Sequence, residues 1–208
     1  MIYVLIPLFN EEHNIEKLHQ SLIVKTKGLL VYYVFVDDGS TDNTVETLSN
    51  FFCKEEHIII RKDVNLGPGH SFKIGFDWIL NRADMEDLIV SMEADGTSDL
   101  TILNVMLDLC NNYGFDLVLA SVYAQGGGFE RTSLFRLIIS FVANMFMRMV
   151  FGIKVLTLSS FYRVYRVEML LRVKSTRGQL ITEHGFVCML ELLLNCIQAN
   201  ASIIEVPM

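Results

Sequence analysis

Two pairs of acidic residues are the part of this 208-residue chain best suited to chemistry. Asp37 and Asp38 directly follow the apolar run 31–36, and Glu93 and Asp95 directly follow a second apolar run. Short apolar runs of this kind are typical of buried strands. In an open α/β sheet, ligands bind at the carboxyl ends of parallel strands, and buried acidic side chains there are costly unless a ligand needs them. We therefore expect both pairs to face a bound ligand.

The spacing of Glu93 and Asp95 suits a divalent cation. Carboxylates one residue apart in a turn can converge on one ion, and Mg²⁺ or Mn²⁺ prefers oxygen ligands together with phosphates. A metal held by two acids and a diphosphate would stabilise a departing nucleoside diphosphate. A purely structural interpretation stays open for both pairs, because Ser40 or Asp42 could cap the helix after the first pair and Ser98 the helix after the second.

Alternating strand and helix patterns must position these acids. Strand patterns at 2–6, 31–36, 58–60, 88–92 and 117–119 alternate with helix patterns that begin near residues 10, 43, 69 and 99. This alternation predicts parallel βαβ units, and therefore an α/β fold with a mixed, mostly parallel sheet flanked by helices. Beyond residue 120 we expect a long helix at 133–151, a strand-like stretch at 159–165, a helix at about 184–198 and a last strand at 202–206.

The composition fits one domain, residues 1–208, that has no affinity for nucleic acid. The hydrophobic content is 51% and the net charge is −7, so we expect no basic surface that would bind nucleic acid. No uncharged run approaches the roughly 20 apolar residues that a membrane-spanning helix needs. We expect a cytoplasmic protein.

Four short motifs follow one another in the first half of the chain. They are Ile-Pro-Leu-Phe-Asn-Glu at 6–11, Val-Asp-Asp-Gly-Ser-Thr-Asp at 36–42, the stretch 61–69 with its Asn-Leu-Gly, and Glu-Ala-Asp at 93–95. Together they resemble the family-2 glycosyltransferases of the GT-A (Rossmann-like) fold, over nearly the whole chain. Several spaced motifs in the correct order are far more specific than any one of them. The resemblance implies a nucleotide-sugar and metal-binding half at 1–120 and an acceptor half at 121–208.

The resemblance also implies a role for individual residues. The donor would be a GDP- or UDP-linked sugar, and Mg²⁺ or Mn²⁺ would be the cofactor, held on the diphosphate by Glu93 and Asp95. Asp95 is then one of the catalytic residues, and Glu93 departs from the family in replacing the usual Asp. The nucleotide would be bound by Pro7, Phe9, Glu11, Asp37, Asp38 and Gly69.

Two motifs in the second half narrow the resemblance to one group. Ser-Ser-Phe-Tyr-Arg-Val-Tyr at 159–165 and Ile-Glu-Val-Pro at 204–207 resemble stretches of the polyprenyl-phosphate sugar transferases of the dolichol-phosphate mannose synthase type. In that group basic residues bind the phosphate of the acceptor lipid. Arg136, Ser140 and Arg163 occupy the corresponding places here.

Two departures from that group concern the acceptor side. Val122 stands where the group has an arginine, and the basic stretch that follows Glu-Val-Pro in the group is absent because the chain stops at Met208. We expect either that the natural chain continues past Met208 or that its acceptor site is incomplete.

The predicted helix 133–151 has a narrow polar stripe. Arg136, Ser140, Asn144 and Arg148 follow one another four residues apart, and the rest of the helix is mainly apolar. An apolar face of this width suits an interfacial helix on the cytoplasmic membrane surface, or a helix buried between the subunits of a homo-oligomer. Packing in the domain core is the third option.

We expect an inverting, metal-dependent transfer of a hexose from a nucleoside-diphosphate sugar to polyprenyl phosphate. Glu191 lies on the apolar side of the last predicted helix and, with Asp95 and Arg163, is a candidate catalytic residue. One alternative is transfer to a sugar hydroxyl in polysaccharide assembly, which needs Glu183 or Glu191 as a base. The other is a nucleotide-sugar-binding domain without turnover.

Overall fold

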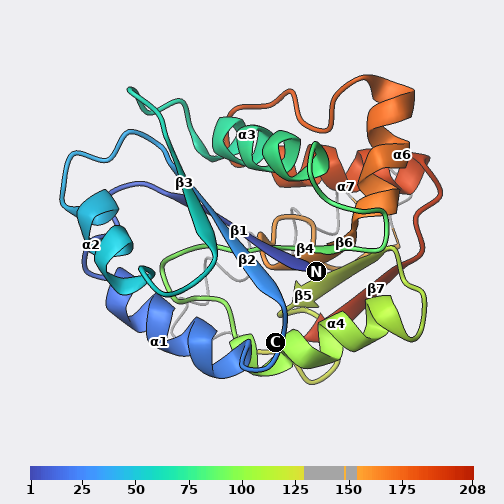
Figure 1. Cartoon of the computed structure of the whole chain (residues 1–208). Helices are drawn as coiled ribbons and strands as arrows, with labels where there is room; N and C mark the ends of the chain where they lie inside the picture. The colour runs from blue at the N-terminus through green and yellow to red at the C-terminus, as the bar shows by residue number, and fades with distance from the viewer. Residues whose placement is uncertain (129–147, 149–153) are drawn as a thin grey trace.

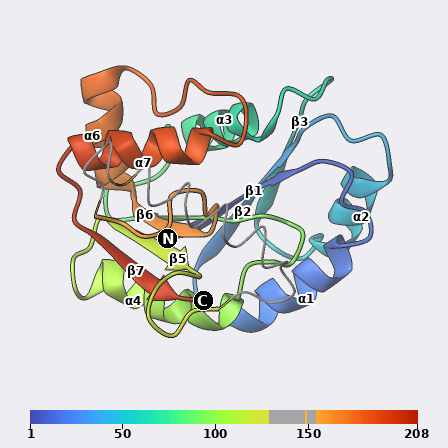
Figure 2. The ribbon, with the colours of Figure 1, turned by 180° about the vertical axis from the view of Figure 1, so that it is seen from behind.

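The fold is a central sheet with helices on both of its faces, as Figures 1 and 2 show from opposite sides. The structure is a computed structural model, and it describes residues 1–128, 148 and 154–208. Within these residues seven strands form one sheet. The strands are β1 (Ile2–Leu8), β2 (Val31–Asp37), β3 (His57–Arg61), β4 (Leu88–Ser91), β5 (Leu117–Ser121), β6 (Arg163–Arg166) and β7 (Ile203–Pro207).

The order of the strands is β3-β2-β1-β4-β6-β5-β7. β6 runs antiparallel to its neighbours β4 and β5, and the other neighbouring strands are parallel. This confirms the predicted α/β fold with a mixed, mostly parallel sheet. It also creates a topological switch point, because the chain leaves β1 toward β2 on one side and β4 pairs with β1 on the other. Open α/β sheets bind ligands at such a point, outside the carboxyl ends of the strands.

The helices divide between the two faces of the sheet. They are α1 (Ile15–Lys25), α2 (Thr44–Phe51), α3 (Pro68–Leu80), α4 (Leu103–Asn111), α6 (Val167–Arg177) and α7 (Cys188–Gln198), with a short 3₁₀ helix η1 (Leu100–Ile102) before α4. α1, α2 and α4 pack on one face, and α3, α6 and α7 pack on the other. Each face of the sheet has its own hydrophobic core, and successive residues of β1 contribute to different cores. Leu5 packs in the core on the face covered by α3, and Ile6 packs in the core on the face covered by α1.

The second half of the chain differs from the sequence prediction in three places. The pattern at 159–165 predicts a strand, but only its end is paired, as β6. The last predicted helix begins at Cys188 rather than near residue 184, because the preceding residues form a loop. Helix α6 was not predicted, although Val167, Leu170 and Val173 give it a buried stripe and Gly178 ends it with a positive φ of 80°.

The predicted helix 133–151 lies outside the described residues, except for Arg148, which is helical. Among the residues that are described, no helix is both long enough and apolar enough to cross a membrane.

Candidate active site

A cavity of about 660 Å³ opens at the carboxyl ends of β1, β2 and β4, and we call it the strand-end cavity. Residues from all three strand ends line it. Those that the sequence predicted as site residues are Pro7, Phe9, Glu11, Asp38, Glu93 and Asp95. The structure therefore brings together most of the predicted donor-side and metal-side residues.

Several hydrogen bonds tie the turn after β1 to the turn after β2. The backbone N–H of Asn10 donates to Ser40 Oγ (2.9 Å), and Asn10 Oδ1 accepts from the N–H of Thr41 (2.9 Å). The N–H of Glu11 donates to Thr44 Oγ1 (2.8 Å). Asn10 has a φ of 56°, a left-handed conformation that asparagine tolerates better than most residues. These bonds fix the backbone that carries Glu11 at the edge of the cavity.

The two adjacent acids of β2 face different surroundings. Asp37 is fully buried, its Oδ1 accepts from the N–H of Ser40 (3.2 Å), and its Oδ2 lies 3.6 Å from Nε of Arg61. Asp38 lines the strand-end cavity, whereas Asp37 does not. Asp37 is the last residue of β2, and Asp38 follows it in the turn that borders the cavity. Asp37 thus holds the turn in place, and Asp38 is the one available to a ligand.

Asp38 is itself held by neighbours from the stretch 61–69. Its Oδ1 accepts from the N–H of Leu66 (2.8 Å) and forms an ion pair with the ammonium of Lys62. Lys62 Nζ also donates to Nδ1 of His70 (3.2 Å). Burial, together with the positive charge of Lys62, lowers the pKa of His70. The negative charge of Asp38 is therefore balanced by the positive charge of Lys62.

The cavity also carries the acids Glu93 and Asp95, which form no ion pair with a basic residue of the described part of the chain. Burial and, to a lesser extent, the negative charges of Asp95 and Glu11 raise the pKa of Glu93 to about 7, although a hydrogen bond from Thr97 opposes the shift. Asp95 is exposed, and its Oδ1 accepts from the N–H (3.0 Å) and the hydroxyl (2.7 Å) of Thr97. A divalent cation would relieve the repulsion between these carboxylates.

The donor set fits Mg²⁺ or Mn²⁺ only as a shared site. No group of three or more His, Cys, Asp or Glu side chains within the described part of the chain is arranged to hold a metal ion. Glu93 and Asp95 would supply two carboxylates, and phosphate and water oxygens would complete the coordination. Mg²⁺ in particular is commonly bound by one or two carboxylates together with substrate phosphates.

Gly69 lies beside the cavity rather than in its lining. Its N–H donates to the carbonyl of His184 (2.7 Å), and a Cβ at this position would lie 2.1 Å from the carbonyl oxygen of Glu183. Helix α3 starts here, with Pro68 in its first turn. Gly69 therefore allows the backbone of residues 183–184 to approach the start of α3.

Arg163, for which we expected contact with the acceptor phosphate, is enclosed by protein groups. The residue is fully buried, and its guanidinium donates to three carbonyls: those of Ser160 (Nε, 2.6 Å), Leu158 (Nη2, 2.9 Å) and Met189 (Nη1, 2.8 Å). A buried charge is stabilised only when its donors are satisfied in this way. Arg163 ties β6 and the segment before it to α7.

The remaining predicted acceptor and catalytic residues are Arg136, Ser140 and Glu191. Arg136 and Ser140 are outside the described residues. Glu191 does not line the strand-end cavity, and its carboxylate accepts hydrogen bonds from residues 182 and 183. The sequence placed Glu191 correctly on α7 but did not indicate this partner.

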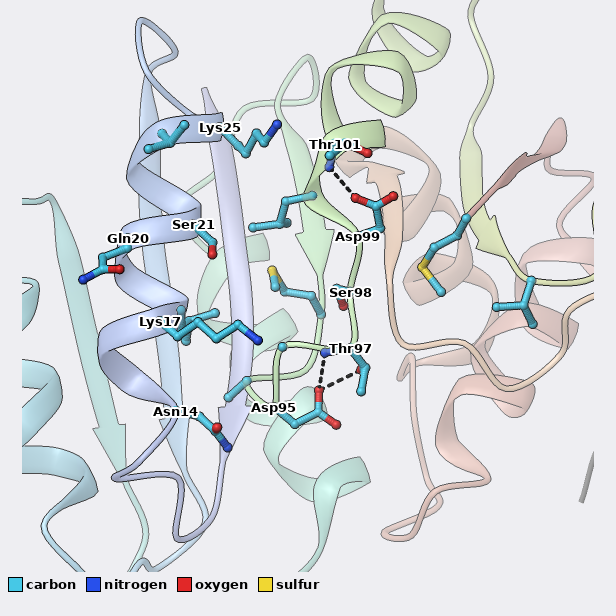
Figure 3. A pocket seen from close by; sticks show the side chains of 18 of the residues that line it. Asn14, Lys17, Gln20, Ser21, Lys25, Asp95, Thr97, Ser98, Asp99 and Thr101 are labelled. Atoms are coloured by element: carbon cyan, nitrogen blue, oxygen red, sulfur yellow. Dashed lines mark hydrogen bonds between the residues drawn. The ribbon is translucent and has the colours of Figure 1, made fainter. Parts of the chain in front are cut away.

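A second and larger cavity, of about 1160 Å³, lies between α1 and the segment 95–101, and we call it the α1 cavity (Figure 3). It adjoins the strand-end cavity, since Asp95 lines both. Lys17 points from α1 toward the turn 95–97. A Cβ placed on Gly96 would lie 3.5 Å from Lys17 Nζ. Val122, where the resemblance led us to expect an arginine, also lines the α1 cavity.

The sheet order and the acidic strand ends define the class as a GT-A glycosyltransferase fold. Glucosyl-3-phosphoglycerate synthase from Mycobacterium tuberculosis, solved with Mn²⁺, UDP and glucosyl-3-phosphoglycerate, matches with a TM-score of 0.71 at 18% identity, over 100% of this chain and 69% of that one. The same enzyme solved with Mg²⁺ and UDP also gives a TM-score of 0.71. At this identity the likeness shows the fold alone.

The family follows from the sequence match. Residues 3–173 match the model of glycosyl transferase family 2, and the chain belongs to this family. Polyprenol monophosphomannose synthase of Mycolicibacterium smegmatis is 29% identical over 211 residues, which cover 98% of this chain and 75% of that protein. Undecaprenyl-phosphate mannosyltransferase of Micrococcus luteus is 26% identical over 212 residues, which cover 99% and 82%.

Proposed function

We propose that this chain transfers a hexose from a GDP- or UDP-linked sugar to a polyprenyl phosphate. The observation that carries the proposal is the pair of adjoining cavities that share Asp95. The strand-end cavity supplies carboxylates for a metal-bound diphosphate, and the α1 cavity supplies room for an acceptor on the other side of Asp95. The two relatives named above, whose names specify polyprenol and undecaprenyl phosphate, support the choice of acceptor.

In this reaction the donor lies in the strand-end cavity, with its nucleoside toward Asp38 and its diphosphate toward Glu93 and Asp95. Glu93 and Asp95 would hold a Mg²⁺ or Mn²⁺ ion, which would neutralise the charge that develops on the leaving diphosphate. An oxygen of the acceptor phosphate forms the new bond to the anomeric carbon while the bond from that carbon to the diphosphate breaks. The nucleoside diphosphate leaves, and the configuration at the anomeric carbon inverts.

The acceptor phosphate is already anionic, so this chemistry requires no strong general base. The side chains then act mainly by aligning the two substrates and by stabilising charge. A reaction without a general base agrees with the position of Glu191, whose carboxylate accepts hydrogen bonds from the amides of residues 182 and 183. Transfer to a sugar hydroxyl would instead need a base close to the acceptor.

We place the acceptor phosphate in the α1 cavity, close to Lys17. The basic residues among its described lining are Lys17 and Lys25, and Figure 3 shows Lys17 at the end near Asp95. Apolar side chains such as Leu18 and Leu100 line the same cavity and suit the first isoprene units. Since the acceptor is a lipid, the protein would work at a membrane surface.

The test is transfer of radiolabelled sugar from GDP-mannose or a UDP-hexose into polyprenyl phosphate, followed by extraction of the lipid. We expect labelled lipid from the wild-type chain with Mg²⁺ or Mn²⁺, and a loss of at least about a hundredfold in Asp95→Asn or with excess chelator. Asp108→Asn, an exposed acid on α4, is the matched control and should retain full activity.

Two outcomes would contradict the proposal. Full activity of Asp95→Asn in excess chelator would exclude the metal role of Asp95. Tight binding of a nucleoside diphosphate in calorimetry, with no labelled product on any lipid, would favour the interpretation as a binding domain without turnover.

A further inference from the structure

The carboxylate of Glu191, in the first turn of α7, gathers several donors of one loop. Both of its oxygens accept from the N–H of Thr182 (3.0 and 2.9 Å), and Oε2 also accepts from the N–H of Glu183 (2.9 Å). The hydroxyl of Thr182 donates to Oε1 as well. Hydrogen bonds to an ionised acceptor are the strong ones, so this carboxylate fixes the start of the loop 182–186.

The same loop is packed against the start of α3. The N–H of Gly69 donates to the carbonyl of His184 (2.7 Å). A Cβ on Gly67 would lie 2.6 Å from His184 O, and a Cβ on Gly69 would lie 2.1 Å from Glu183 O. Such distances leave no room for a side chain at either glycine. The loop is therefore held from two sides, by Glu191 at its start and by the glycine turn at its middle.

The far end of the loop forms part of the strand-end cavity. Gly185 and Phe186 line the cavity, opposite residues that come from β1 and β4. Phe186 is 70% exposed, and its ring lies edge-on to the ring of Phe161, with 5.9 Å between the centroids. Ligand pockets are lined mainly by apolar and aromatic side chains, so an exposed ring at the wall of a cavity is available to pack against a ligand.

We propose that Glu191 is a positioning residue, which holds the loop 182–186 so that Phe186 packs against the bound donor. The proposal rests on the proposed function, because it assigns the donor to the strand-end cavity. This role differs from that of a catalytic base, which the sequence suggested for Glu191, because the carboxylate contacts the loop and does not line the cavity. Loss of the carboxylate releases the loop and weakens donor binding, and it leaves the chemical step unchanged.

The first experiment compares Glu191→Gln with the wild-type chain in steady-state transfer assays. The amide keeps the size of the side chain but turns one acceptor into a donor that faces the N–H groups of Thr182 and Glu183. We expect the donor KM to rise about tenfold, kcat to stay within about twofold and the pH profile of kcat to keep its shape. Glu168→Gln, an exposed first-turn acid of α6, is the matched control and should change neither constant.

A second variant tests the path from Glu191 to the donor. Phe186→Ala should raise the donor KM by a similar factor, and the double variant with Glu191→Gln should add little, because both changes act through the same loop. Additive effects of the two changes would contradict a shared path. A lower kcat at unchanged donor KM in Glu191→Gln, with loss of the acidic limb of the pH profile, would identify Glu191 as a base and overturn the proposal.

Hydrogen–deuterium exchange separates this proposal from the proposed function. In Glu191→Gln the amides of Thr182 and Glu183 should exchange faster, with the circular dichroism spectrum unchanged. Calorimetry with a nucleoside-diphosphate sugar and Mn²⁺ should show weaker binding. If the wild-type chain transfers no sugar to lipid, the proposed reaction fails while these two measurements still decide the role of Glu191. Unchanged exchange and unchanged affinity would overturn it.

Discussion

Replacement of Arg163 by methionine should destabilise the protein rather than weaken acceptor binding. The side chain is fully buried and donates to the carbonyls of Ser160, Leu158 and Met189 at 2.6, 2.9 and 2.8 Å. Methionine fills much of the same volume but leaves three buried carbonyls without these donors. Each unsatisfied group costs about 1–3 kcal/mol, and relaxation and the removal of a buried charge recover part of it. We expect a net loss of about 3–5 kcal/mol in the free energy of unfolding.

Urea unfolding followed by circular dichroism measures this loss. With a slope of about 2 kcal/mol/M, the midpoint should fall by roughly 1.5–2.5 M. Arg163→Lys should also be destabilised, because one ammonium cannot reach three carbonyls as the guanidinium fork does. Arg177→Met, at an exposed arginine of α6, is the matched control and should change stability by less than about 0.5 kcal/mol.

A different pair of results would refute this reasoning. If Arg163→Met unfolds at the wild-type urea concentration but shows a raised KM for polyprenyl phosphate, the residue contacts the acceptor in solution. The role suggested by the sequence would then be correct, and the buried geometry would not be the active one.

Three further predictions concern the cavities. Because the folded state raises the pKa of Glu93 to about 7, it binds more protons than the unfolded state between about pH 4.5 and 7. The metal-free protein should therefore lose stability as pH rises through this window, and Glu93→Gln should not. Urea unfolding of both proteins in chelator at pH 5 and pH 8 measures this, and an equal change of midpoint in the two proteins would contradict it. Lys17→Met should raise the acceptor KM about tenfold at an unchanged donor KM, and Lys27→Met, outside the cavity, should not. Gly69→Ala should cost about 1–3 kcal/mol and weaken nucleotide binding in calorimetry, because its Cβ would meet the carbonyl of Glu183; wild-type affinity would contradict this.

The sequence was sufficient to predict the first half of the fold and the position of its acids. Apolar runs that end in Asp37 and Asp38, or in Glu93 and Asp95, carry both the strand signal and the chemistry within a few residues. The parallel register then brings those strand ends together, as β1 lies between β2 and β4. Local patterns therefore suffice where position along a strand decides position in the site.

The parts that failed depend on contacts between residues far apart in the chain. Arg163 carries the charge that a phosphate needs, but its burial against Met189, 26 residues later, cannot be read from a local motif. The same holds for Glu191, whose partners Thr182 and Glu183 precede the helix predicted at about 184–198. Asp37 and Asp38 differ because Asp37 ends β2 and Asp38 lies beyond it, and an apolar run does not fix the end of a strand to the residue.

The charges around the strand-end cavity constrain how the proposed donor can bind. Glu11, Asp38, Glu93 and Asp95 line it, and among these Asp38 is paired with Lys62. A nucleoside diphosphate adds negative charge to this set, and two like charges 4 Å apart repel by about 4 kcal/mol at an effective dielectric constant of 20. A few such pairs would offset most of the binding energy of a micromolar ligand, which is about 8 kcal/mol. The acids can therefore hold the diphosphate only if a cation binds with it. Burial is the main cause of the raised pKa of Glu93, and the negative charges of Asp95 and Glu11 add to it. A cation bound between these acids and the diphosphate would both lower this pKa and offset the repulsion of the donor.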